Sequence, residues 1–370
     1  MRWTPLLLYA FFLLAACASP VDKNEAKNVN VDHELVDMHV DFAQNFTLES
    51  IENGYILHLI DPNTLKTERT YTLTYDHSVE GENTIHLPCS RIANLSQTSV
   101  GMMSILGATN SITGISNINY VYDPKIIARF NKKQVAEFGD ETNFPIEKIV
   151  ASESRIILYS GFGKDFPQAS KLTELGITPI PNYDWRETHP LGKAEWIKVI
   201  GILCGKEAAA NSYFEKVKSS YLKLAQKAAL VEHRPTVMSG NIYGSVWYSP
   251  AGESYMSMLF ADAGADYVYR FTQGAGSIER GIEQILKDNL TTEFWMNPGD
   301  FSKARLLENA PQIKHLKAFE SNTYCYTHNG NKFWERSASE PHLVLSDLLQ
   351  LFHPELGGSD SLHFYQKIQP

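Results

Sequence analysis

A long run near the middle of the chain carries apolar residues at helical spacing. Within Lys206–Ala228, apolar side chains recur three or four positions apart, at Ala210, Phe214, Val217, Tyr221 and Leu224. The Lys and Glu residues of the run fall between them, so the pattern predicts an amphipathic helix. A helix of this length would be roughly 34 Å long, which is about the width of a small domain. On spacing alone, this helix could join two lobes or lie within a single domain.

Strand-like and helical runs alternate on both sides of the predicted helix. Before it, strands are predicted at Arg91–Leu95, Ile112–Ile115, Arg155–Tyr159 and Ile177–Ile180, and helices at Val100–Leu106, Ile146–Ala151 and Lys171–Leu175. After it, strands are predicted at Thr236–Gly240, Glu293–Asn297 and Asn322–Thr327, helices at Ser254–Ala261 and Glu283–Lys287, and a long loop at Asn241–Glu253. Such alternation predicts mostly parallel sheets with helices on both faces. An antiparallel segment is expected earlier, with strands at Tyr55–Ile60 and Thr70–Thr74.

The two halves of the chain resemble each other. The stretch Met102–Ser116 can be aligned with Tyr255–Tyr269, and Glu147–Gly161 with Glu283–Gly299. A repeat of this kind indicates that one lobe design is used twice, which favours two lobes over a single domain. Ligands of open α/β sheets bind outside the carboxyl ends of the strands. A cleft lined by the loops at those ends is therefore expected between the lobes.

The predicted fold class is α/β, with two Rossmann-like lobes joined by one long α-helix. The N-terminal lobe is predicted to span residues 40–190, and the C-terminal lobe residues 231–370. Residues 191–230 are predicted to hold the hinge and the inter-lobe helix, in which Gly205 separates the long helix from a shorter helical run before it.

The N-terminus reads as a targeting segment rather than as part of the fold. Arg2 precedes the apolar run Leu6–Leu14, which is too short to span a bilayer stably. The tetrapeptide Leu14-Ala15-Ala16-Cys17 matches the bacterial lipobox, in which the cysteine is acylated and becomes the first residue after cleavage. Residues 1–17 are therefore predicted to be a lipoprotein signal peptide, with Cys17 lipidated, and residues 18–39 a tether. A plain secretory signal is the alternative.

Composition narrows the choice of partners. The chain is 43% hydrophobic and 20% charged, with a formal net charge of −9. This charge argues against nucleic acid and against an anionic membrane surface, because phosphates attract clustered Lys and Arg. Membrane contact is expected through the lipid anchor alone. Besides Cys17, the chain has Cys89, Cys204 and Cys325; Cys204 is expected to be a buried thiol, and a disulfide between the other two is conceivable.

Three stretches resemble the substrate-binding proteins of ABC importers for iron complexes and cobalamin, the class with a single long inter-lobe helix. RIANLSQTSVGMMSILGA at Arg91–Ala108 is similar to the first-lobe signature of that family. The stretch Pro190–Val217 is similar to its hinge and helix, and Glu253–Tyr269 to its second-lobe signature. The resemblance covers nearly all of residues 40–365, and the closest subgroup is the one common in Bacteroidetes.

The resemblance implies a function and a location. It implies a lipid-anchored, monomeric, non-enzymatic binding protein in the periplasm of a Gram-negative bacterium, attached to the inner or the outer membrane. Its partners would be an ABC permease and ATPase, and its ligand an iron chelate, haem or a corrinoid, so that iron or cobalt would belong to the ligand and no cofactor is expected. The family docks on its permease through one surface Glu on each lobe. Gly101 and Met258 occupy those positions here, so docking must use other charges or another partner.

Candidate ligand contacts are aromatic and cationic residues in the predicted loops at strand ends. A large ring-bearing or chelated ligand favours aromatic walls, and Arg neutralises carboxylates or catecholates. The candidates are Tyr183, Trp185, Arg186, Tyr243, Trp247, Tyr248, Arg270, Trp334 and Arg336, together with Ser96, Thr98 and Phe162. Each of these residues could instead fill a lobe core or cap a loop.

The histidines and the known enzyme motifs bear on the alternative functions. A free metal ion would call for several His and an acid in the cleft, but the histidines are dispersed, and His189, His328 and His342 alone fall near predicted cleft or hinge positions. No metal site and no catalytic residues are therefore predicted, and the sequence lacks GxSxG, HExxH and Walker motifs. A metal-ion binding protein, a surface lipoprotein that serves an outer-membrane receptor and a chelatase-like enzyme remain as alternatives.

Overall fold

The computed structural model describes residues 35–141, 144–162, 166, 168–356 and 361–370. The predicted signal peptide, Cys17 and most of the predicted tether lie outside the described residues. No helix among the described residues combines the length and the apolar character that crossing a membrane requires.

The first sheet is an antiparallel meander with one parallel addition. It consists of β1 (Phe46–Ile51), β2 (Gly54–Ile60), β3 (Thr67–Thr74) and β4 (Thr84–His86), in that spatial order. The pairs β1–β2 and β2–β3 are antiparallel, which confirms the predicted antiparallel segment, whereas β3–β4 is parallel. Tyr55, Leu57 and Leu59 alternate along β2 and are fully buried, as expected for a strand with one face on the core.

The N-terminal lobe is completed by a parallel sheet. Its strands are β5 (Ile92–Asn94), β6 (Ile112–Ile115), β7 (Ala136–Glu137), β8 (Ile156–Tyr159) and β9 (Thr178–Pro181), in the order β7-β6-β5-β8-β9. Its helices are α1 (Gln97–Ile105), α2 (Pro124–Asn131), α3 (Ile146–Ala151) and α4 (Ala169–Glu174). The ends of the predicted strands and helices of this region agree with the structure to within two residues, except that α1 begins three residues earlier than predicted. Helix α2 and strand β7 were not predicted.

The C-terminal lobe repeats this sheet. Its strands are β10 (Thr236–Ser239), β13 (Asp266–Tyr267), β15 (Phe294–Met296), β16 (Thr323–Tyr326) and β17 (Tyr365–Lys367), in the order β13-β10-β15-β16-β17. Its helices are α8 (Tyr255–Asp262), α9 (Ile282–Asn289), α10 (Lys303–Asn309), α11 (Lys317–Ser321), α12 (Asn331–Arg336) and α13 (Pro341–Phe352). The order β13-β10-β15-β16 matches β6-β5-β8-β9, as the sequence repeat predicts, and β17 adds an antiparallel edge.

The predicted loop at Asn241–Glu253 is wrong. The strands β11 (Asn241–Tyr243) and β12 (Val246–Pro250) form a hairpin there, and β14 (Ser277–Gly281) pairs with β12 in a three-stranded antiparallel sheet. Gly244, with φ of 63°, supplies the positive dihedral angle that the tight turn needs. This small sheet has no counterpart between β5 and α1 in the first lobe.

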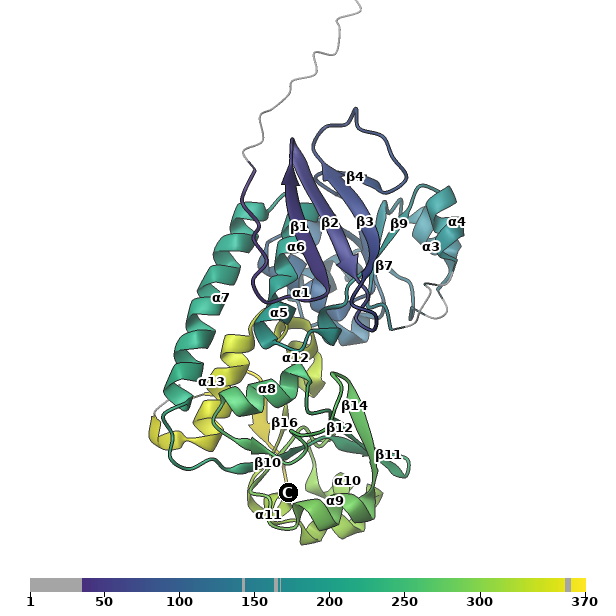
Figure 1. Ribbon diagram of the computed structural model, residues 1–370. Coiled ribbons are helices and arrows are strands. Elements are labelled where there is room, and N and C mark those ends of the chain that lie inside the picture. Colours follow the sequence, from purple (N-terminus) through teal and green to yellow (C-terminus); the bar gives the residue numbers. More distant parts are fainter. Residues whose placement is uncertain (1–34, 142–143, 163–165, 167, 357–360) are drawn as a thin grey trace, which may run out of the picture. The chain divides into compact units, whose positions relative to one another are not determined.

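One long helix connects the lobes. Helix α7 (Glu207–Ala228) packs against α6 (Ile197–Leu203) at one end and against α13 at the other (Figure 1). Its buried face includes Ala210, Phe214, Val217 and Tyr221, so the predicted amphipathic helix is confirmed. The shorter helix α5 (Pro190–Glu195) precedes α6, and Gly205, with φ of 62°, ends α6 before α7 begins.

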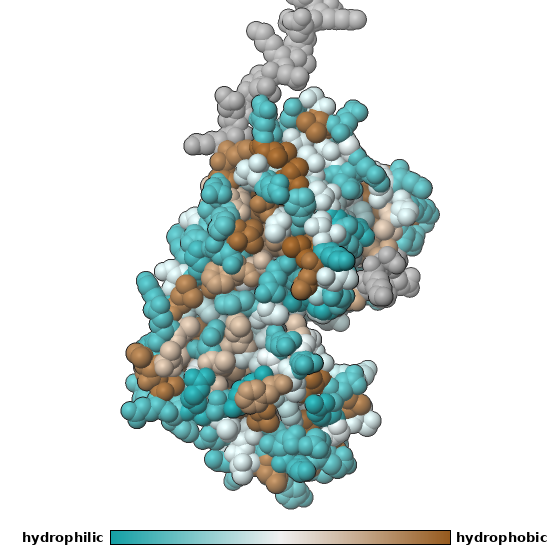
Figure 2. All heavy atoms as spheres, viewed as in Figure 1, coloured by the Kyte–Doolittle hydropathy of each residue, from teal (hydrophilic) through white to brown (hydrophobic). Residues whose placement is uncertain are grey.

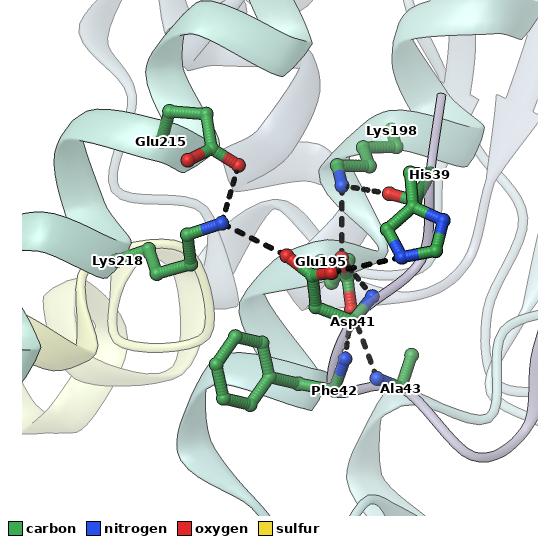
Figure 3. Close-up of polar contacts among 8 residues, drawn as sticks. All are labelled: His39, Asp41, Phe42, Ala43, Glu195, Lys198, Glu215 and Lys218. Atoms are coloured by element: carbon green, nitrogen blue, oxygen red, sulfur yellow. Dashed lines mark hydrogen bonds and ion pairs between the residues drawn. The ribbon is translucent and has the colours of Figure 1, made fainter. Parts of the chain in front are cut away.

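A buried ion pair fixes the segment before β1, residues 39–45, which we call the strap, to these helices (Figure 3). The Glu195 carboxylate accepts hydrogen bonds from the backbone N–H groups of Asp41, Phe42 and Ala43 at 2.7–2.9 Å. It also forms an ion pair of 2.8 Å with Lys198, whose Nζ donates to a strap carbonyl oxygen as well. Both side chains of the pair are almost completely buried.

A second lysine holds the strap from outside. Lys218 on α7 forms ion pairs of 2.8 Å with Asp41 of the strap and with Glu215 on its own helix (Figure 3). All three side chains keep a quarter to a half of their surface in contact with solvent. The strap is therefore held by one buried and one half-buried lysine.

Candidate functional site

A cavity of about 880 Å³ opens between the lobes. The surface in Figure 2 is indented between the upper and the lower lobe. Most of the cavity wall belongs to the C-terminal lobe and follows the carboxyl ends of its parallel strands: Ser239 and Gly240 at β10, Asn297 and Gly299 at β15, and Tyr326 at β16. This is where open α/β sheets bind ligands.

Two further parts of the C-terminal lobe extend this wall. Tyr248, Ser249 and Pro250 of β12 line one side, so the hairpin that interrupts the second half of the repeat builds part of the site. Tyr255 and Met256 stand in the first turn of α8. Ser254 caps that helix by accepting a hydrogen bond from the Ser257 N–H group, which fixes the position of this turn.

The N-terminal lobe contributes an aromatic pair. The rings of Phe162 and Trp185 lie 4.6 Å apart, and the Trp185 Nε1–H group donates to the Ser160 carbonyl oxygen at 2.6 Å. The Arg186 guanidinium lies 5.2 Å from the centre of the Trp185 ring, and Arg186 itself does not line the cavity. The exposed fraction of Phe162 is 70%, so most of this residue is open to solvent at the edge of the cavity.

Four of the predicted ligand contacts line the cavity, namely Phe162, Trp185, Tyr248 and Trp334. They come from both lobes and from segments far apart in the sequence: Tyr248 lies on β12 and Trp334 on α12. The fold therefore brings together four of the seven predicted aromatic residues.

Several predicted contacts are occupied elsewhere within the described residues. Trp247 is 1% exposed, donates to the Ser249 hydroxyl at 3.0 Å and packs against Trp295 in the core. Tyr183 is buried and donates to Glu68 at 2.7 Å. Neither side chain lines the cavity, because its polar group already has an internal partner.

The predicted cations also lie outside the cavity wall. Arg186 donates to the Asn63 side chain at 2.9 Å, Arg336 forms an ion pair with Glu340 at 2.6 Å, and Arg270 lies over the exposed Phe271 ring. Tyr243, on the outer strand β11, is 80% exposed.

Ser96 and Thr98 belong to a polar network and do not line the cavity. Their hydroxyl oxygens are 3.0 Å apart, and the Asn182 side chain donates to both at 3.3 Å. Asn182 in turn accepts a hydrogen bond from the Asp184 N–H group at 3.3 Å. The network fixes the turn that carries Asp184 and Trp185, so the two hydroxyls support a cavity residue rather than line the cavity themselves.

Sequence reasoning missed Lys193, which lines the cavity from α5. Every residue of α5 is buried, and Lys193 is 5% exposed. Its Nζ atom is 3.8 Å from Asp184 Oδ2 and 4.3 Å from the centre of the Tyr255 ring. The signal in the sequence was a charged residue in the largely apolar hinge stretch, which also holds Glu195 and Lys198, but the burial of Lys193 depends on contacts between distant segments.

Asp184, the partner of Lys193, is 2% exposed. Burial raises the pKa of the Asp184 carboxyl, and the nearby Lys193 ammonium and Thr98 hydroxyl offset part of that rise. Its Oδ2 atom has no hydrogen-bond partner among the described residues. Burial also raises the pKa of the Tyr326 phenol, so this group meets the cavity in its neutral form.

Of the described histidines and cysteines, Cys325 alone lines the cavity. No group of three or more His, Cys, Asp and Glu side chains in the described part of the chain is arranged to hold a metal ion. His189 caps α5 by accepting from the Leu191 N–H group at 2.9 Å, and burial lowers the pKa of His342 to about 4. Cys89, Cys204 and Cys325 are buried free thiols, so the conceivable disulfide between the first and the last is not formed.

Gly101, which occupies the first of the two expected docking positions, lies on α1 where α12 covers that helix. A Cβ atom added at Gly101 would lie 1.7 Å from the backbone oxygen of Glu335, so no side chain fits between α1 and α12. The Glu335 carboxylate accepts hydrogen bonds from the Gln97 side chain at 3.0 Å and from the Tyr122 N–H group at 2.7 Å. Met258, at the second such position, is half-buried.

Comparison with known proteins identifies relatives of the chain. Residues 92–329 match the model of a family described as periplasmic binding protein. An uncharacterized lipoprotein of Methanocaldococcus jannaschii is 26% identical over 295 residues, which cover 76% of this chain and 70% of the relative. A second uncharacterized lipoprotein of the same organism is 25% identical over 276 residues, covering 70% of this chain and 68% of the relative.

Solved structures of similar fold include two binding proteins of stated ligand. A periplasmic haem binding protein from Pseudomonas aeruginosa has a TM-score of 0.59 at 13% identity, covering 76% of this chain and 99% of that one. A periplasmic vitamin B12 binding protein of Vibrio cholerae has a TM-score of 0.55 at 13% identity, covering 73% and 99%. At such low identity the likeness is one of fold.

Proposed function

The chain belongs to the periplasmic binding protein family, and from that premise we propose that it is the solute-binding component of an ABC importer. It captures an iron complex, either a siderophore or haem, or else cobalamin, in the cavity between its lobes. The observation that carries this proposal is a cavity at the carboxyl ends of the strands whose walls present aromatic rings from both lobes.

The size and the lining of the cavity suit a large ring system. Its volume of about 880 Å³ lies in the upper part of the range typical of small-molecule sites. Phe162 and Trp185 stand on the N-terminal side, and Tyr248 and Trp334 on the C-terminal side. Aromatic faces on two sides bury the flat surface of a porphyrin, a corrin or a catecholate chelate, and this burial supplies the main free energy of binding.

The connection between the lobes favours a small closing motion. Helix α7 is continuous over Glu207–Ala228, and bending it would lengthen or break backbone hydrogen bonds. Rotation of the lobes on ligand binding is therefore expected to be slight. Phe162, exposed at the edge of the cavity, is a side chain that such a rotation would bring onto the ligand.

The partners follow from the same proposal. An ABC permease and its ATPase would receive the ligand, and acylation of Cys17 would hold the protein at a membrane. The covered position at Gly101 means that docking on the permease uses surface groups other than a side chain at that site. An accessory role beside an outer-membrane receptor would need none of the family's docking contacts.

Calorimetry tests the proposal. Haem, cyanocobalamin and ferric siderophores are titrated into the chain without its signal peptide, and at least one is expected to bind at micromolar concentration or tighter. Trp334→Ala is expected to weaken that binding about tenfold or more, because an aromatic wall of the cavity is lost.

The matched control is Tyr243→Ala, which removes an exposed ring outside the cavity wall and should leave binding unchanged. Absence of binding by all these ligands would contradict the proposal. Stoichiometric zinc or manganese in the purified protein would instead favour a metal-ion binding protein.

A further inference from the structure

The cavity wall contains a buried lysine whose charge is incompletely balanced. Lys193 lines the cavity and is 5% exposed. Its ammonium is 3.8 Å from Asp184 Oδ2, which is longer than a hydrogen bond. Within the described part of the chain, the Lys193 ammonium also lies 4.3 Å from the centre of the Tyr255 ring. This cation–π interaction is not a directional hydrogen bond to an acceptor atom.

The partner of this lysine is itself incompletely satisfied. Asp184 Oδ2 is buried and has no hydrogen-bond partner among the described residues. Burial favours the neutral form of the carboxyl, as the raised pKa of Asp184 indicates. A buried ammonium whose counter-charge lies beyond hydrogen-bond distance costs free energy until another anion reaches it.

The charge of the other cation on the cavity wall, Arg305, is already balanced. Arg305 forms an ion pair with Asp300 at 3.5 Å, and its side chain is 61% exposed, so water and a neighbouring carboxylate already balance its charge. An anionic ligand group gains more from a desolvated cation than from a hydrated one, because the effective dielectric constant is lower inside the protein. The two wall cations are therefore unequal.

We propose that Lys193 binds a carboxylate of the ligand and so makes the site selective for ring compounds or chelates that carry carboxylates. The inference rests on the proposed function and narrows its ligand class. The ligand carboxylate would accept a charge-assisted hydrogen bond from Lys193 Nζ. Trp185 follows Asp184 directly in the chain and lines the same cavity, so the ring body of the ligand would lie against the aromatic walls while its carboxylate reaches the hinge.

The test compares ligands with and without the carboxylate. Dissociation constants are measured by calorimetry or absorbance titration for haem, haem dimethyl ester, ferric citrate and cyanocobalamin. The wild type is expected to bind haem at least tenfold more tightly than its dimethyl ester. Lys193→Met should abolish that preference and leave the affinity for the ester unchanged, whereas Lys193→Arg should retain most of the preference.

Arg305→Met is the matched control, since it removes the exposed cation of the same wall and should keep the preference. Circular dichroism and thermal unfolding establish that each variant is folded. Binding of haem or ferric citrate with a tenfold or larger loss in Lys193→Met supports the inference. A preference that survives in Lys193→Met, or disappears in Arg305→Met, overturns it.

The same panel separates the inference from the proposed function. Tight binding of cyanocobalamin or of haem dimethyl ester alone would overturn the role of Lys193 and leave an importer binding protein in place. Failure of the wild type to bind any of the four probes would overturn both.

Discussion

Two buried lysines stand five residues apart in the hinge, and their charges are balanced in different ways. Lys198 on α6 is paired with Glu195 at 2.8 Å and donates to the His39 carbonyl oxygen, and Glu195 accepts three backbone N–H groups of the strap. Lys193 on α5 is 3.8 Å from Asp184, whose Oδ2 atom has no hydrogen-bond partner in the described part of the chain. The first pair is closed, and the second is open toward the cavity.

The difference shows how a structural ion pair can be told from a binding group. The charged groups of both pairs are buried, so each pair has a desolvation cost. In the closed pair, hydrogen bonds from the strap offset that cost, and no further partner is needed. In the open pair the cost is incompletely offset, and the accessible volume beside Lys193 is the place from which an anion can complete it.

The largest effect is expected from breaking the closed pair. Lys198→Met leaves the Glu195 carboxylate buried without its counter-charge, which should lower the free energy of unfolding by about 3–5 kcal/mol. Chemical denaturation with urea, followed by circular dichroism, measures the loss. The double variant Glu195→Gln, Lys198→Met should recover part of it, because neither charge then remains in the core.

The same variants test whether the Lys198–Glu195 pair contributes to stability alone and not to ligand binding. Lys198 does not line the cavity, so ligand affinity of the folded Lys198→Met protein should equal that of the wild type. A loss below 1 kcal/mol, or a selective loss of ligand binding, would show that the closed pair has been misassigned as structural.

Much of the fold was open to prediction because its signals are local. The spacing of apolar residues in α7, the alternation of strands and helices and the repeat of the two sheets all lie in short stretches of sequence. The aromatic residues Phe162, Trp185, Tyr248 and Trp334 were predicted from loops at strand ends, and they line the cavity. For the helix and the alternating strands, the neighbours along the chain determine the outcome.

The rest depends on pairing between distant segments. Trp247 and Tyr248 were both predicted as contacts in a loop, but they are successive residues of β12 and point to opposite faces. The first is in the core, with 1% exposed, and the second is on the cavity wall. The burial of Lys193 likewise arises from Asp184 and Tyr255, which adjoin it through the fold and not through the sequence.

A smaller effect is expected from Glu187, which holds the end of the strap. Its carboxylate accepts hydrogen bonds from the Gln44 and Asn45 N–H groups and from Trp196 Nε1 at 2.8–3.0 Å. Burial nevertheless raises the pKa of Glu187 to about 7, from an ordinary value of 4.5. The folded state therefore keeps a proton that the unfolded chain releases, so this group contributes stability below pH 4.5 that is lost as the pH rises through about 7.

The pH dependence is measured as the difference in free energy of unfolding between the wild type and Glu187→Gln. Between pH 5 and pH 8 this difference should shift against the wild type by about 3 kcal/mol at most. Taking a difference is necessary because His342, whose pKa is lowered to about 4, shifts stability in the opposite direction below pH 6.5. A difference that is constant with pH would show that Glu187 titrates normally and that strap hydrogen bonds outweigh its burial.

The smallest effect is expected from the lysine that holds the strap at the surface. Lys218 makes two ion pairs of 2.8 Å, yet its side chain and those of Asp41 and Glu215 remain partly hydrated. Exposed pairs of this kind contribute about 0.2–1 kcal/mol, because solvent screens the attraction and two long side chains must be ordered. Lys218→Met should therefore lower the free energy of unfolding by no more than about 1 kcal/mol, and 1 M salt should erase most of that loss. A loss of more than about 2 kcal/mol that persists in high salt would mean that Lys218 fixes the strap as firmly as Lys198 does. Burial and a full set of hydrogen bonds would then not distinguish the Lys198 ion pair from the others.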